Sequence, residues 1–70
     1  MREITKKIID INNELEDVLS ELVKAYKSEN VPRKRLALDR TIRHILKACA
    51  EVYQSVLILT TEFIEEVMEK

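Results

Sequence analysis

Apolar side chains recur at alternating intervals of four and three residues along most of this chain. The first half carries the series Ile4, Ile8, Ile11, Leu15, Val18, Leu22 and Ala25. The second half carries the series Leu38, Ile42, Ile45, Cys49, Val52, Val56, Leu59 and Phe63. This heptad spacing places one apolar seam along each of two α-helices. The sequence therefore predicts an all-α protein.

The strongest break between the two series is at Val31-Pro32. Proline lacks an amide proton and disfavours the helical conformation in the residue before it, but it suits the first position of a new helix. Asn30 is the best-suited residue for a left-handed conformation that closes the first helix. We expect helices over about 3–28 and 32–69, forming an antiparallel hairpin because the connection is short. Residues 1–70 then form a single domain with no separate linker or tail.

The second helix has more apolar surface than one neighbouring helix can cover. A flanking row adds a second apolar stripe, Leu46, Tyr53, Thr60 and Val67, and another row adds a third, Leu36, Ala50, Leu57 and Ile64. Such a broad face is typical of a helix with two or more neighbours. A chain of 70 residues with one cysteine and one histidine has no internal disulfide or zinc site to supplement a small core. We therefore expect a homodimeric four-helix bundle.

The ends and the middle of the second helix favour an antiparallel dimer. The cations of residues 33–35 lie in its first turn and three glutamates lie in its last turn, both opposite to the preference of the helix dipole. A twofold axis near Cys49 and Ala50 would bring these opposite charges together between two copies, and the small central residues would let the helices approach closely. The predicted dimer interface comprises Ala48, Cys49, Ala50, Val52, Val56, Leu59, Phe63, Ile64 and Val67.

Residues suited to catalysis or metal binding do not form a recognisable set. His44 lies opposite the seam and has no acidic partner at a suitable spacing, which indicates a surface histidine. Cys49 lies on the seam, where a buried small side chain is expected rather than a nucleophile. The Glu-x-x-His pairs of di-iron bundles are missing, because Thr41 stands three residues before His44. We expect no enzymatic activity, no catalytic or metal-binding residues and no cofactor.

The segment 33–47 carries a local charge of +5, although the whole chain has a net charge of −1. One outward stripe of the second helix should present Arg33, Arg40, Arg43, His44 and Lys47. A cationic stripe can follow nucleic-acid phosphates or contact an acidic partner. Aromatic residues that would stack on bases are nearly absent, and a charged stripe is more often a solvated face. Nucleic-acid binding by a small regulator is therefore the alternative function.

The preferred function is an adaptor or accessory subunit that binds another protein. Surplus apolar surface and the missing catalytic set favour this hypothesis. Ile58 and Met68, on the otherwise polar face of the second helix, are candidate contacts for that protein.

The expected location is the cytoplasm. No apolar run approaches the length of a membrane span, and Met1-Arg2-Glu3 is not followed by the apolar segment of a signal peptide. A lone cysteine fits a reducing compartment. The absence of glycine, with one glutamine and many isoleucines, glutamates and lysines, favours a thermophilic source.

Overall fold

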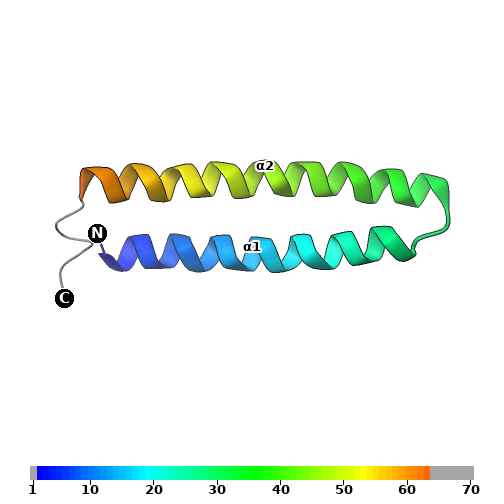
Figure 1. The fold of residues 1–70 in the computed structure, drawn as a ribbon, viewed down its shortest axis with the longest axis horizontal. Helices are drawn as coiled ribbons and strands as arrows, with labels where there is room; N and C mark the ends of the chain where they lie inside the picture. Colours follow the sequence, from blue (N-terminus) through cyan, green and yellow to red (C-terminus); the bar gives the residue numbers. More distant parts are fainter. Residues whose placement is uncertain (1, 64–70) are drawn as a thin grey trace.

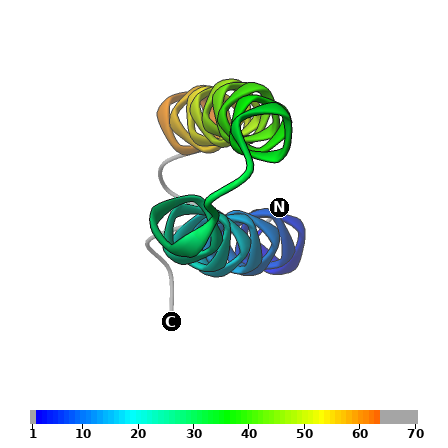
Figure 2. The same ribbon diagram turned by 90° about the vertical axis from the view of Figure 1, so that its right-hand side faces the viewer.

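The computed structural model describes residues 2–63, which form two helices. Helix α1 spans Arg2–Ser28 and helix α2 spans Pro32–Glu62. They run antiparallel and side by side (Figure 1), and the end-on view shows them inclined to one another (Figure 2). The predicted all-α hairpin is confirmed. The predicted continuation of the second helix over 64–69 lies outside the described residues.

Side-chain and backbone hydrogen bonds close α1 at its C-terminal end. The Ser28 hydroxyl donates to the carbonyl oxygens of Lys24 and Ala25, at 3.2 and 3.3 Å. The Glu29 amide donates to the Tyr26 carbonyl at 3.4 Å. No residue between 2 and 63 has a positive φ, so the prediction of a left-handed Asn30 is wrong. Hydrogen bonds from nearby polar groups to carbonyl oxygens close the end of α1 without a left-handed residue.

The start of α2 follows from Val31 and Pro32. Val31 is extended, with φ −82° and ψ 119°, and Pro32 occupies the first turn of the helix. The Val31 amide donates to the Glu29 carboxylate at 3.1 Å, and the Val31 carbonyl accepts the Arg35 amide at 2.9 Å. The proline thus sets the boundary between the helices as predicted.

The predicted seam of α2 faces α1. Seven of its members are half-buried and recur at alternating intervals of four and three residues, whereas Phe63, at the end of the described chain, is exposed. The half-buried members are Leu38, Ile42, Ile45, Cys49, Val52, Val56 and Leu59. Because the two helices pack on one another along their length, this burial assigns the seam to the contact with α1.

The seam of α1 differs from the predicted one. The side facing α2 carries Thr5, Ile8, Asn12, Leu15, Leu19, Leu22 and Tyr26. Ile8, Leu15 and Leu22 lie there as predicted, but Ile4, Ile11, Val18 and Ala25 are exposed. Helix α2 covers the side of this row that carries Leu19 and Tyr26. The prediction that Ile4, Ile11, Val18 and Ala25 belong to the covered seam is therefore wrong.

The hairpin buries little apolar surface. None of the described hydrophobic residues is buried, and the buried residue is Thr5, at 3% exposure. The chain exposes 5831 Å², against about 4,500 Å² for a compact protein of its mass. Its radius of gyration is 15.9 Å, against about 11 Å for a compact domain of this length. Two helices in this arrangement cannot enclose a core.

Charged substitutions in the seam should prevent folding. We expect Leu22→Asp or Val52→Asp to abolish the thermal melting transition followed by circular dichroism. Each would place a charge between the helices at a cost of several kcal/mol, comparable with the whole stability of a small domain. The control Lys24→Asp lies on the exposed face of α1 and should leave the transition nearly unchanged. An unchanged transition in either seam variant would contradict the observed packing.

Candidate interaction surfaces

One exposed apolar row runs along α1. We call Ile4, Ile11, Val18 and Ala25 the α1 row; they recur every seven residues, and Ile11 is 52% exposed. The row facing α2 at the equivalent positions contains Thr5, Asn12, Leu19 and Tyr26. The hairpin thus leaves the more apolar of the two rows in solvent, where burial by another chain would stabilise it.

Helix α2 carries a second seam beside the one that faces α1. We call Leu36, Asp39, Arg43, Leu46, Ala50, Tyr53, Leu57 and Thr60 the second seam, because their spacing also alternates between three and four. Leu46, Tyr53 and Leu57 are exposed, Tyr53 by 55%. This spacing is that of a helix–helix contact. Asp39 and Thr60 are half-buried, but the large apolar members of the second seam are left in solvent.

The α1 row and the second seam lie on opposite sides of the hairpin. Ile4, Ile11 and Val18 each precede a residue of the α1 seam, whereas Leu46 and Tyr53 each follow a residue of the α2 seam. In antiparallel helices, rows that follow seam residues share one side, and rows that precede them share the other. One partner can therefore cover one surface without blocking the other.

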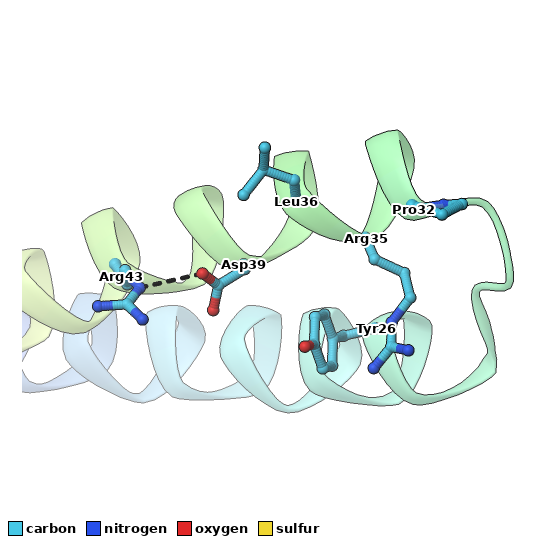
Figure 3. A pocket seen from close by; sticks show the side chains of 6 residues that line it. All are labelled: Tyr26, Pro32, Arg35, Leu36, Asp39 and Arg43. Carbon is cyan, nitrogen blue, oxygen red and sulfur yellow. Dashed lines mark hydrogen bonds and ion pairs between the residues drawn. The ribbon is translucent and has the colours of Figure 1, made fainter.

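Two arginines at the loop end have partners that pattern reading of the sequence missed. The Arg35 guanidinium lies 4.4 Å from the centroid of the Tyr26 ring, and Arg43 Nε pairs with Asp39 Oδ2 at 3.1 Å. Figure 3 shows Arg35 reaching toward α1 while Leu36 points away from it. These residues and Pro32 line a shallow groove. The aromatic face offsets the unfavourable position of Arg35 in the first turn of α2.

The five residues of the predicted basic stripe are all exposed along α2: Arg33, Arg40, Arg43, His44 and Lys47. Arg43 forms an ion pair with Asp39. The pair is open to solvent, since the Arg43 side chain is 76% exposed. The stripe is therefore an open, solvated cationic surface.

The residues predicted to form the dimer interface fall into three groups. Those half-buried on the α1-facing side of α2 are Ala48, Cys49, Val52, Val56 and Leu59. Ala50 and Phe63 are exposed. Ile64 and Val67, together with the candidate contact Met68, lie outside the described residues. Ile58, the other candidate contact, is the most exposed large hydrophobic residue described, at 62%.

Over residues 2–63, no three His, Cys, Asp or Glu side chains are placed to share a metal ion. Neither described helix combines the length and apolarity needed to cross a membrane. No protein-family model, curated protein or solved structure matches the chain. The surfaces themselves therefore carry the argument about function.

The Tyr26–Arg35 contact should contribute measurably to stability. In a double-mutant cycle with Tyr26→Leu and Arg35→Ala, we expect a coupling free energy of about 0.5–1 kcal/mol, the magnitude of an exposed cation–π contact. Urea unfolding of the four proteins measures it. The matched control replaces Arg35→Ala by Arg33→Ala and should give no coupling. Equal coupling in both cycles would mean a general charge effect rather than the ring contact.

Proposed function

We propose that the chain is a non-enzymatic interaction module of the cytoplasm, an adaptor or accessory subunit that forms a homodimeric four-helix bundle and binds another protein. The observation that carries the proposal is the exposure of large apolar side chains. Within residues 2–63, eleven large hydrophobic residues are exposed and none is buried. A further helical chain on these faces would supply the core that the hairpin lacks.

The exposed area is of the size that a stable homodimer removes from solvent. Two separate hairpins expose 5831 Å² each, whereas a compact protein of twice the mass exposes about 7,500 Å². Pairing into a compact body would bury about 4,000 Å², within the range of about 2,000–5,000 Å² found for obligate homodimers. The surplus surface therefore supports a dimer as the folded unit.

A homodimer closed on one side of the hairpin leaves the other side for a different protein. The α1 row suits that role because acidic residues flank its middle. Residues 10–21 contain five acidic side chains and no basic one, and Glu14 and Glu21 lie one turn after Ile11 and Val18. The partner chemistry that fits is an amphipathic helix with an apolar stripe and basic flanks.

Nucleic-acid binding is the second candidate, favoured by the open cationic surface of α2. Arg33, Arg40 and Lys47 recur at intervals of seven and are all exposed. Two observations oppose nucleic-acid binding. Arg43 already forms an ion pair with Asp39, and the guanidinium of Arg35 already lies against the ring of Tyr26. The stripe offers phosphate contacts without a base-reading element.

Self-association can be measured directly. We expect sedimentation equilibrium at micromolar concentration to give at least twice the chain mass of 8.2 kDa, because a lone hairpin leaves its second seam in water. The control Lys24→Asp should give the same mass. A folded monomer at that concentration would contradict the proposed homodimer.

Capture from extract of the source cells separates the two candidate functions. We expect immobilised protein to retain a specific protein, and the double variant Ile11→Lys, Val18→Lys to lose it, because lysines on the α1 row oppose an apolar, basic partner. The matched variant Arg40→Glu, Lys47→Glu, in which both changes lie outside the second seam, should retain it.

The reverse pattern would identify the alternative function. A nucleic-acid ligand would be lost with Arg40→Glu, Lys47→Glu and kept with the lysine variant. Added salt would release it steeply, since binding to phosphates releases counterions. Retention of nucleic acid with that pattern would replace the adaptor proposal.

A further inference from the structure

The second seam of α2 can lie against an antiparallel copy of itself with the twofold axis between Glu51 and Val52. In that register six of its eight members pair with one another: Ala50 with Tyr53, Leu46 with Leu57, and Arg43 with Thr60. An antiparallel copy of α2 centred there would place every one of these residues opposite another seam residue. A register centred on Ala48 would pair all eight members but would set the Asp39 carboxylate opposite the apolar Leu57.

The sizes of the side chains favour that pairing over a parallel one. In the antiparallel arrangement, the small Ala50 faces the large Tyr53 of the second copy, and Leu46 faces Leu57. A parallel arrangement would oppose Tyr53 to Tyr53 and Ala50 to Ala50, which crowds one layer and leaves a void in the next. Alternating large and small residues fill such a contact best. The phenol of Tyr53 can reach water at the edge.

The charges on α2 favour the same direction. Residues 33–47 hold six cations and one acid, Asp39, so a parallel copy would set this segment beside itself. In the antiparallel arrangement, Glu62 is level with Thr41 of the second copy, within its basic segment. Single exposed pairs of this kind stabilise little, but together they select the orientation.

The α1 row is a poorer surface for self-pairing. It is a single row of residues seven apart, whereas the second seam has the alternating spacing of a complete helix contact. Its acidic segment, residues 10–21, would lie beside the same segment of an antiparallel copy. Like charges opposite one another oppose association, so this surface suits a different, basic partner.

We infer that two copies associate through antiparallel pairing of their α2 second seams, with Ala50 of each chain against Tyr53 of the other. The inference rests on the proposed homodimer and specifies its face, direction and register. Leu46 and Leu57 flank the central layers, and Ile58, although more exposed, lies off the contact.

Exchanging the two central residues tests the register. Ala50→Tyr and Tyr53→Ala should each raise the dimer dissociation constant about tenfold or more, through overpacking or a cavity. The double variant with both changes restores a tyrosine opposite an alanine and should return to within a few-fold of the parent. Ile58→Ala is the control and should leave dimerisation unchanged. A double variant no better than the single ones would overturn the inferred register.

Spin labels test the direction even where a variant folds poorly. In a Cys49→Ala background, labels at Lys34→Cys should lie about 50 Å apart, from about 1.5 Å of rise per residue. A short distance in a dimer would overturn the inference while leaving the proposed homodimer intact. A monomer by sedimentation would overturn the proposed homodimer itself, and the inference with it.

Discussion

The contact between the apolar seams of α1 and α2 determines everything else in this hairpin. It holds two helices of 27 and 31 residues in an elongated body of 51 × 17 × 12 Å. Two helices give each other only one covered side, so even the apolar residues of the seams are no more than half-buried. Burial of apolar area supplies most of the stability of a small domain, and this is the reason for proposing a second layer of helices.

The sequence was sufficient to predict the two helices over the described residues, the position of the turn and the seam of α2. Pro32 marks the boundary without ambiguity, and the α2 seam is apolar at every position from Leu38 to Leu59. The seam of α1 was not predictable in the same way. Leu15 and Leu22 have apolar neighbours on either side, and heptad spacing alone does not decide which side turns toward α2. Which side of α1 faces α2 depends on the side chains of α2, and the sequence of α1 alone does not determine it.

The contacts at the loop end show a second limit of pattern reading. Helix-dipole rules identify Arg35 as unfavourably placed but do not reveal its partner. Tyr26 lies in the last turns of α1, and the short connection folds it back beside the first turn of α2. Likewise Ser28 and Glu29 close the end of α1 through bonds that span only two to four residues. Both results depend on side-chain geometry, which the periodicity of apolar residues does not contain.

The rotation of α1 links the hairpin to its assembly. Turning Thr5 and Asn12 toward α2 places polar groups in the seam, and Asn12 Oδ1 is buried without a hydrogen-bond partner among the described residues. Such a group lowers stability, although a polar residue at a seam position can also fix the register of two helices. The same rotation directs Ile4, Ile11 and Val18 outward. The stability lost at Asn12 would be offset if another chain covered Ile4, Ile11 and Val18. The orientation of α1 is therefore consistent with the proposal that the hairpin acts in contact with other chains.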